Sequence, residues 1–341
     1  MKDILLRLQR GEAFREEEMN ALFSQIMEGG CSDAEIAAFL MGLSMRGETV
    51  DELTGAARVM RAKASGVSAP AGAVDCCGTG GDKSGTYNIS TAVALVVAAC
   101  GVPVAKHGNR ASSSKSGAAD VLEQLGVNLD ASQDVLAQAL ERFSFAFLMA
   151  PKHHAAMKHV MPVRKALGVR TIFNLLGPLA NPAGTKRQLI GVLDRKWLIP
   201  FAETLRRLGS ESAWIVHGSD GLDEITTTGE TFVAKLENGV IEETILSPGD
   251  FGLDVSRAED LIGGDAALNA AALSDVLDGK RCAYRDIVLA NAAAVLMISK
   301  DTNGLGVHTL RDSVALAAEA VNSGRARGVL DGYINFTKGV S

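Results

Sequence analysis

The segment GTGGDKSGTYNIST, residues 78–91, carries residue types that hold phosphate groups against bare backbone. Glycines let backbone N–H groups approach an anion, and a helix that starts directly afterwards adds a favourable dipole. The segment is not a Walker loop, because Asp82 and Cys77 stand where that pattern requires glycine. We therefore predict a phosphate-binding turn of another type, with a tight turn that binds no ligand as the alternative.

A second polar loop, KHGNRASSSKSG at residues 106–117, follows the expected strand 102–105. Lys106, Arg110 and Lys115 supply positive charge, and four serines supply hydroxyl groups. Such a loop alone could be merely solvated. Loops that follow successive parallel strands face the same crevice. Together the two loops predict a site for a polyphosphorylated ligand.

An adjacent acidic pair, Asp223 and Glu224, follows the expected strand 212–218. Most such pairs are ordinary surface, and we expect these two acids to be exposed near a cleft. In a chain that gathers phosphate-binding loops, however, vicinal carboxylates suit a Mg²⁺ ion that joins the protein to a pyrophosphate. A third group lies in residues 162–182, where Arg164 could pair with a carboxylate or could be a solvated helix residue.

Composition narrows the class of protein. The net charge of −6 is the wrong sign for a general nucleic-acid surface. The longest apolar runs, such as residues 91–100, are too short to span a bilayer, and the first residues lack a signal-peptide pattern. The five cysteines show no paired metal spacing and are expected to be reduced. We predict a cytoplasmic protein with no nucleic-acid or membrane partner.

The elements that must position these groups fall into two parts. Residues 1–65 predict helices, two of which start at the capping boxes Ser32–Glu35 and Thr49–Glu52. A Gly, Ser and Pro-rich segment at 64–73 then breaks the helical periodicity. From there on, short apolar runs alternate with helices, which predicts an α/β domain with a mainly parallel sheet, and a hairpin is expected at 231–246.

We therefore expect a small helical domain at 1–65, joined by helices from about 160–182, and a large α/β domain at 74–341. The N-terminal helices carry more apolar residues than so short a unit could bury by itself. A homodimer through this helical domain is the expected consequence. The residues in question are Met19, Leu22, Phe23 and Ile26.

Four motifs in chain order resemble the signatures of the anthranilate phosphoribosyltransferase family, enzymes of tryptophan biosynthesis. They are GTGGD with NIST, KHGNRASSSKSGAADVLEQLG, RTIFNLLGPLANP and GLDEIT. The resemblance implies a fold similar to the nucleoside phosphorylases and related phosphoribosyltransferases. It also implies an activity: transfer of the phosphoribosyl group of phosphoribosyl pyrophosphate (PRPP) to the amine of anthranilate, which gives phosphoribosyl-anthranilate and pyrophosphate.

The resemblance implies three groups of site residues. PRPP would be bound by Gly78, Gly81, Asp82, Thr86, Asn88, Ile89, Ser90, Thr91, Lys106, His107, Gly108, Asn109, Arg110, Ala111, Ser112, Ser113, Ser114 and Ala118. Anthranilate would be bound by Gly78, His107, Asn109, His154, Arg164 and Gly177. Mg²⁺, expected as two ions carried with the pyrophosphate, would meet Ser90, Asp223 and Glu224.

No discrete catalytic acid or base is expected, because an aromatic amine can attack once it is correctly positioned. The role of Asp82 stays open between ribose hydroxyls and metal-bound water. Ala118 stands where the family commonly has serine, so a hydroxyl contact is missing there.

Two alternative functions differ in the sequence features that they require. A pyrimidine nucleoside phosphorylase would lack the KHGNR segment and the acidic pair. A non-catalytic nucleic-acid-binding relative should be basic and could lose both loops, whereas this chain has a charge of −6 and intact loops.

Overall fold

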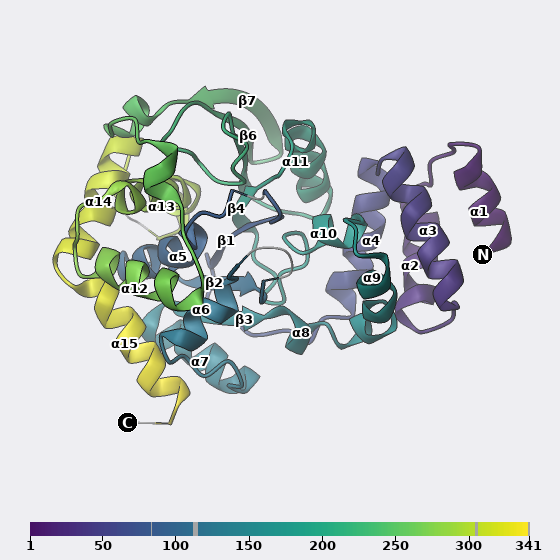
Figure 1. Ribbon diagram of the computed structural model, residues 1–341, viewed down its shortest axis with the longest axis horizontal. Coiled ribbons are helices and arrows are strands. Elements are labelled where there is room, and N and C mark those ends of the chain that lie inside the picture. The colour runs from purple at the N-terminus through teal and green to yellow at the C-terminus, as the bar shows by residue number, and fades with distance from the viewer. Residues whose placement is uncertain (83, 112–114, 304–305, 340–341) are drawn as a thin grey trace.

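The structure is a computed structural model, and it describes residues 1–82, 84–111, 115–303 and 306–339, without the side chains of residues 300–303. Figure 1 shows a large lobe around a sheet and a smaller helical lobe that contains the N-terminus. Among the described residues, no helix is long and apolar enough to cross a membrane.

The helical lobe begins with four helices: α1 (Lys2–Gln9), α2 (Glu16–Met27), α3 (Asp33–Arg46) and α4 (Val50–Ala62). Both predicted capping boxes are confirmed, because the side chains of Ser32 and Thr49 accept from the backbone N–H groups of Glu35 and Glu52. Two later helices, α9 (Met161–Leu167) and α10 (Ile172–Leu176), pack against α3 and α4.

The apolar residues of α2, on which the expected homodimer rested, are covered within one chain. Met19, Phe23 and Ile26 are fully buried, and Leu22 is 6% exposed. The reason is long-range packing, since α4 lies along α2 and the Phe173 ring of α10 lies 5.4 Å from that of Phe23. These residues therefore give no argument for a dimer.

The large lobe contains one seven-stranded sheet of order β3-β2-β1-β4-β5-β6-β7. The first five strands in this order are parallel, and β6 and β7 add an antiparallel hairpin at one edge, which confirms the expected mainly parallel sheet. The turn of the hairpin has positive φ at Asn238 and Gly239, as predicted for this pair. The strands are β1 (Val74–Gly78), β2 (Val104–Gly108), β3 (Phe145–Met149), β4 (Arg187–Gly191), β5 (Ser212–Gly218), β6 (Thr231–Glu237) and β7 (Val240–Leu246).

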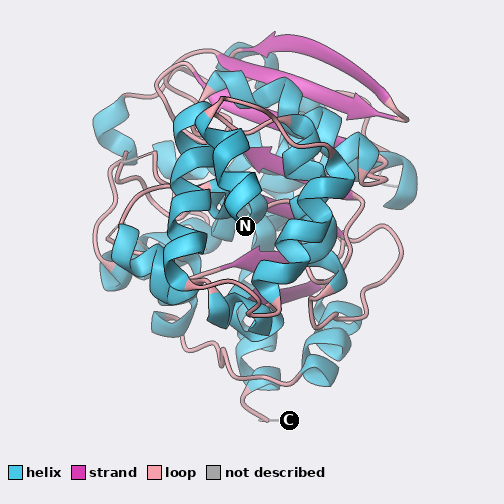
Figure 2. Ribbon diagram, turned by 90° about the vertical axis from the view of Figure 1, so that its right-hand side faces the viewer, coloured by secondary structure: helices cyan, strands magenta, loops and turns pink. Residues whose placement is uncertain are grey.

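Helices cover both faces of this sheet (Figures 1 and 2). The side chains of a strand alternate between faces, so Trp214 of β5 joins one hydrophobic cluster and Ile215 joins the other. The cluster around Trp214 centres on α5 and α13, whereas the cluster around Ile215 continues into the helical lobe. The remaining helices are α5 (Ile89–Ala99), α6 (Ala118–Gln124), α7 (Gln133–Phe143), α8 (Ala150–His153), α11 (Leu198–Arg207), α12 (Ala266–Leu277), α13 (Ala283–Asn303), α14 (Leu310–Asn322) and α15 (Arg325–Thr337).

The carboxyl ends of the parallel strands lead directly into the predicted loops. β1 leads into the glycine loop, defined here as residues 78–88, β2 leads into the loop 106–117, and β5 leads into the loop 219–226. Gly78 pairs with Gly191 in the sheet register, so β1 and β4 end at the same level. The fold thus brings the three sequence motifs to one edge of the sheet.

Candidate functional site

The glycine loop adopts backbone conformations that side chains disfavour. Gly80, Gly81 and Gly85 have φ values of +66°, +81° and +66°, in the left-handed region. Asp82 turns back on the loop, where its carboxylate accepts a 2.6 Å hydrogen bond from the Ser84 hydroxyl. The loop is therefore held by its own contacts.

The far end of the glycine loop is fixed by a segment that follows the hairpin. Thr86 forms an isolated antiparallel bridge with Ile262, and the N–H of Gly263 donates to the Gly85 carbonyl at 2.8 Å. This contact joins segments that are far apart in the chain and sets where α5 begins.

The acidic pair lies directly under the glycine loop. Asp223 Oδ2 accepts a 2.7 Å hydrogen bond from the Gly80 N–H. A Cβ atom on Gly78 would lie 2.3 Å from the same oxygen, and one on Gly191 would lie 1.6 Å from the Asp223 carbonyl oxygen. Glycine at the ends of β1 and β4 is thus what allows the acid to approach.

The expectation that both acids are exposed is wrong. Asp223 is 9% exposed, and Glu224 is half-buried. Burial is the main cause that raises the pKa of Asp223 to about 7, with repulsion from Asp82 adding to it. Burial, and then the charge of Asp223, raise the pKa of Glu224 to about 8. The two acids therefore hold their protons to a higher pH than free carboxyl groups do.

Ser90 and Lys106 complete this part of the site. The buried Lys106 ammonium donates to the Cys76 carbonyl at 2.7 Å and to the Ser90 hydroxyl at 3.2 Å. The Ser90 backbone hydrogen-bonds to Glu224, which lowers the pKa of that carboxyl against the effect of burial. Lys106 therefore acts on the site through Ser90 and through its charge.

These groups fit Mg²⁺ by their chemistry. Two carboxylates and a hydroxyl are oxygen ligands that Mg²⁺ prefers, and a cation there would take the place of the protons that the raised pKa values keep on the acids. No group of three or more His, Cys, Asp or Glu residues suited to a metal is found within the described part of the chain.

The N-terminus of α5 faces this edge of the sheet. Asn88 occupies the N-cap position, but its side chain makes no capping hydrogen bond. Ile89 is buried in the core, and Thr91 Oγ1 is buried with no hydrogen-bond partner among the residues that the structure describes. A helix start with unpaired polar groups is suited to an anion.

The loop after β2 is shaped mainly by Asp120 of α6. Its carboxylate accepts from the backbone N–H groups of Ala111 and Gly117, each at 2.9 Å. Arg110 pairs with Asp120 and Glu123, so its guanidinium lies against α6. Asn109, the residue before Arg110, has an exposed side chain.

The other predicted residues of this loop have different surroundings. A Cβ atom on Gly108 would lie 2.7 Å from the Phe147 ring, and Ala118 is the first residue of α6. Ser112, Ser113 and Ser114 lie outside the described residues.

Two histidines lie together beside the loop 106–117. The rings of His107 and His154 are 5.3 Å apart, and each Nε2 atom is buried without a hydrogen-bond partner among the described residues. His107 Nδ1 lies 3.2 Å from the Gly177 carbonyl oxygen. Burial lowers the pKa of His107 to about 3 and that of His154 to about 4. Both rings are therefore neutral at pH 7 and offer unpaired nitrogens.

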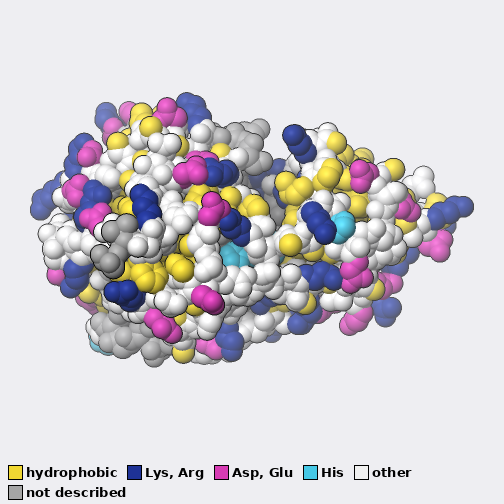
Figure 3. Space-filling model, turned by 90° about the horizontal axis from the view of Figure 1, so that it is seen from below, with side chains coloured by type: hydrophobic (Ala, Val, Ile, Leu, Met, Phe, Trp, Pro, Cys, Tyr) yellow, Lys and Arg dark blue, Asp and Glu magenta, His cyan; other side chains and the backbone are white. Residues whose placement is uncertain are grey.

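Arg164 is placed by α9, in the segment that belongs to the helical lobe. Its guanidinium lies 5.5 Å from the centre of the Phe173 ring, and its Nη1 lies 3.9 Å from Met161 Sδ. Burial lowers its pKa. It pairs with no carboxylate of the described residues. Figure 3 shows the molecule narrowing between the two lobes, with hydrophobic side chains gathered on the adjoining face of the smaller lobe.

Sequence reasoning missed three residues that organise the site. Arg170 Nη1 donates to the Gly80 carbonyl at 2.6 Å, from the segment between α9 and α10. Asp75, fully buried in β1, accepts from the His107 N–H at 3.2 Å and from Asn181 Nδ2 at 2.8 Å. Arg170 and Asn181 stand in the quoted RTIFNLLGPLANP motif, which could have indicated them; Asp75 lies in an apolar strand and gave no signal.

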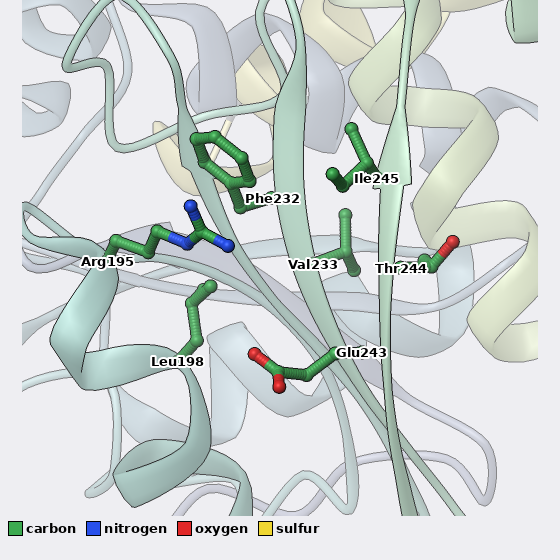
Figure 4. Close-up of a pocket in the computed structure, with 7 residues that line it drawn as sticks. All are labelled: Arg195, Leu198, Phe232, Val233, Glu243, Thr244 and Ile245. Atoms are coloured by element: carbon green, nitrogen blue, oxygen red, sulfur yellow. The ribbon is translucent and has the colours of Figure 1, made fainter.

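A cavity of about 230 Å³ lies elsewhere, between the start of α11 and the β6–β7 hairpin (Figure 4). Arg195 stacks over Phe232 there at 3.8 Å, and Glu243 lies on the opposite side. None of the predicted site residues lines it.

The fold and the site define a glycosyl transferase with a helical and an α/β part. The model of the "Glycosyl transferase family, helical bundle domain" matches residues 2–64, and that of the "Glycosyl transferase family, a/b domain" matches residues 70–327.

Individual relatives narrow this class. The chain is 56% identical over 337 residues to an anthranilate phosphoribosyltransferase of Azospirillum brasilense, an alignment that covers 99% of this chain and 93% of the relative. The crystal structure of the anthranilate phosphoribosyltransferase from Thermus thermophilus matches with a TM-score of 0.91 and 41% identity, over 98% of this chain and 99% of that chain. The chain belongs to the anthranilate phosphoribosyltransferase family.

A third match comes from a complex. The Saccharomyces cerevisiae anthranilate phosphoribosyltransferase with PRPP and Mg matches with a TM-score of 0.88 and 26% identity, over 99% of this chain and 98% of that chain. The comparisons favour neither the nucleoside phosphorylase nor the nucleic-acid-binding alternative.

Proposed function

We propose that this chain transfers the phosphoribosyl group of PRPP to the amine of anthranilate, which gives phosphoribosyl-anthranilate and pyrophosphate in tryptophan biosynthesis. The observation that carries the proposal is the junction of the glycine loop with the buried acids, where Asp223 accepts from the Gly80 N–H. An anion-binding loop and a cation-binding pair in contact suit a magnesium pyrophosphate group.

The donor would bind along the glycine loop and the start of α5. Backbone N–H groups of the loop and of Thr91 would hold the phosphates, and Lys106 would orient the Ser90 hydroxyl. Mg²⁺ bound at Ser90, Asp223 and Glu224 would neutralise the charge that develops on the leaving pyrophosphate. Such preorganised electrostatic stabilisation is usually the largest contribution to catalysis.

The acceptor would bind between the neutral histidines and α9. Arg164 would pair with the anthranilate carboxylate, because a half-buried guanidinium with no carboxylate partner among the described residues favours an anion. The unpaired Nε2 atoms of His107 and His154 would face the ring and its amine. The amine needs no strong base, so the residues act by positioning it against the ribose.

The activity is tested with purified protein, PRPP, anthranilate and Mg²⁺, by following the loss of anthranilate fluorescence. We expect loss only when PRPP and Mg²⁺ are both present. A fluorescence that stays constant with all components present would overturn the proposal. Replacing anthranilate with a pyrimidine nucleoside and phosphate tests the phosphorylase alternative in the same preparation.

We further propose that two Mg²⁺ ions enter with the pyrophosphate. The support is the adjacency of two carboxyl groups, each of which could contribute oxygen ligands to a cation when it is ionised. Titration of Mg²⁺ against the protein and a fixed PRPP concentration, followed by calorimetry, should give two equivalents per site. A stoichiometry of one would limit the site to a single ion.

We propose that the protein is a homodimer through its helical lobe. The residues of α2 no longer support this proposal, because they are buried. Its support is the exposure of two apolar side chains, Leu6 on α1, which is 40% exposed, and Met45 on α3, which is 82% exposed. Light scattering at micromolar concentration should give twice the mass of one chain, and a monomer mass would remove the proposal.

We also propose the domain division into 1–65 with helices from 160–182, and 74–341, supported by the packing of α9 and α10 on α3 and α4. A cytoplasmic location is proposed on the five free cysteines, which suit a reducing compartment. Fractionation of cells that produce the protein would test the location.

A further inference from the structure

Asn269 of α12 links three segments of the donor site. Its side chain is buried, with 2% exposed. Its Nδ2 donates to Asn88 Oδ1 at 2.8 Å and to Ser116 Oγ at 3.1 Å, while its Oδ1 accepts from the Gly264 N–H at 2.8 Å. One amide therefore joins the start of α5, the loop 106–117 and the segment that fixes the glycine loop.

The hydrogen bond from Asn269 engages the side chain of Asn88, the N-cap residue of α5. An asparagine at an N-cap position ordinarily accepts a hydrogen bond from one of the first backbone N–H groups of its helix. Here Asn88 Oδ1 accepts instead from Asn269 and from the Ser116 hydroxyl, at 2.8 and 2.9 Å. The N-cap side chain is turned away from α5, and it makes no capping bond.

The backbone of Asn88 is fixed as well. Its carbonyl accepts a 3.0 Å hydrogen bond from the Tyr284 hydroxyl of α13. The backbone of Asn88 is therefore fixed at the N-cap position, while its side chain is held toward Asn269 and Ser116.

At the start of α5 the Ile89 N–H donates to the Tyr87 carbonyl at 2.9 Å and the Ser90 backbone hydrogen-bonds to Glu224. The Thr91 N–H is the next along the helix and receives no bond from the N-cap side chain, and Thr91 Oγ1 is buried with no partner among the described residues.

We propose that Asn269 is a positioning residue of the donor site. By holding the Asn88 side chain away from α5, it keeps the Thr91 N–H in the first turn of that helix open for a phosphate group of PRPP. It also fixes the distance between α5 and the loop 106–117. The inference rests on the proposed function, because PRPP is the anion that it assigns to this helix start.

The test compares two variants in steady-state kinetics with each substrate varied in turn. Asn269→Ala should raise the KM for PRPP roughly tenfold or more, because Asn88 Oδ1 loses one of its two donors and can turn to cap α5, where it competes with the phosphate. The KM for anthranilate should stay within about twofold of wild type. The control is Asn128→Ala, since Asn128 also links distant segments, through the Thr337 carbonyl of α15 at 2.9 Å, but contacts no donor-site residue among those described.

A double-mutant cycle shows whether Asn269 acts through Asn88. In an Asn88→Ala background no side chain is left to cap α5, so adding Asn269→Ala should change PRPP binding little further. Binding is measured by calorimetry with PRPP and Mg²⁺ in the absence of anthranilate. Losses that add fully would overturn the inference, because they would mean that Asn269 supports the site independently of Asn88.

The outcomes separate the two proposals. Wild-type protein that neither binds PRPP nor consumes anthranilate would overturn the proposed function. An active wild type, with the KM for PRPP unchanged in Asn269→Ala, would overturn only the inference. If circular dichroism shows Asn269→Ala to be unfolded, Ser116→Ala takes its place. It removes the other bond to Asn88 Oδ1 and should raise the KM for PRPP selectively, and an unchanged KM would count against the inference.

Discussion

Asp223 and Arg170 hold the same glycine from opposite sides. Asp223 Oδ2 accepts from the Gly80 N–H at 2.7 Å, and Arg170 Nη1 donates to the Gly80 carbonyl at 2.6 Å. The glycine loop is thereby fixed to the sheet through Asp223 of the loop 219–226, and to the helical lobe through Arg170 of the segment after α9. If the donor engages Asp223 as proposed, it should also affect Gly80, and the contact between Arg170 and Gly80 would then respond to donor binding.

The first prediction concerns the acidic pair. The double variant Asp223→Asn, Glu224→Gln should lose turnover while keeping its fold, because the amides keep the size of the two side chains but cannot supply the carboxylate oxygens that Mg²⁺ prefers. The assay is anthranilate fluorescence, with Glu230→Gln, an exposed acid nearby, as the matched control. Turnover near the wild-type level in the double variant would remove the pair from the site.

The second prediction concerns pH and the protein without ligands. The pKa values of about 7 and about 8 lie above the unfolded values of about 4, so between pH 4 and 8 the native state keeps protons that the unfolded state has released. This contribution to stability is present at low pH and is lost as pH rises. The melting temperature of the double variant, relative to wild type, should therefore increase from pH 5 to pH 8. A difference that does not vary with pH would show that the acids titrate normally.

The third prediction concerns Lys106, whose buried charge opposes the rise that burial causes in the pKa values of Glu224 and Asp75. Lys106→Met should raise the pKa of Glu224 further and release the Ser90 hydroxyl. More Mg²⁺ should then be needed at pH 7 for PRPP to stabilise the protein in thermal melts. Lys280→Met, which removes a surface charge paired with Asp275, is the control. The same Mg²⁺ dependence in both variants would contradict a role for Lys106 at the metal.

The fourth prediction compares two glycines of similar backbone conformation. Gly81 and Gly239 have φ values of +81° and +83°, so alanine strains both alike. A Cβ atom on Gly81 would lie 2.0 Å from Arg170 Nη1, whereas nothing lies within 4 Å of one on Gly239. Gly81→Ala should weaken PRPP binding far more than anthranilate binding, and Gly239→Ala should change neither. Equal losses for both substrates would point to general destabilisation.

The fifth prediction concerns the acceptor. Arg164→Ala should raise the KM for anthranilate and lower its kcat/KM roughly thirtyfold to hundredfold, the effect of losing a charged contact worth about 2 to 3 kcal/mol. Arg164→Lys should recover only part of the lost kcat/KM, because an ammonium cannot form the two parallel hydrogen bonds of a planar guanidinium. Lys165→Ala on the exposed side of α9 is the control. An unchanged KM for anthranilate would make Arg164 a helix residue without a role in binding.

Local patterns predicted much of the fold because their causes are local. The capping boxes at Ser32 and Thr49 and the turn at Asn238 depend on residues within a few positions, and the structure confirms all three. The meeting of the glycine loop and the acidic pair followed from the rule that parallel strands end at one edge. The structure brings these motifs into direct contact.

The features that the sequence did not predict depend on contacts between segments that are far apart in the chain. The burial of Met19 and Phe23 requires α4 and α10, which the pattern of α2 cannot reveal. Asn269 lies 181 positions from Asn88, and its helix carries no motif. The burial of Asp223 follows from the missing Cβ atoms of two strand-end glycines, which only the sheet register brings together.

The hydrophobic cluster around Ile215 crosses the boundary that the chain suggests near residue 65. It joins Phe23 and Leu40 of the helical lobe with Phe201 of α11. It also includes the side chains of β4, β5 and β6 that lie on the same face of the sheet as Ile215. A fragment that ended at residue 64 would expose that shared surface to water and aggregate, and the sheet would lose its cover on one side. The two lobes should therefore melt in one cooperative transition, and in evolution the helical lobe could be exchanged only together with the sheet face it covers.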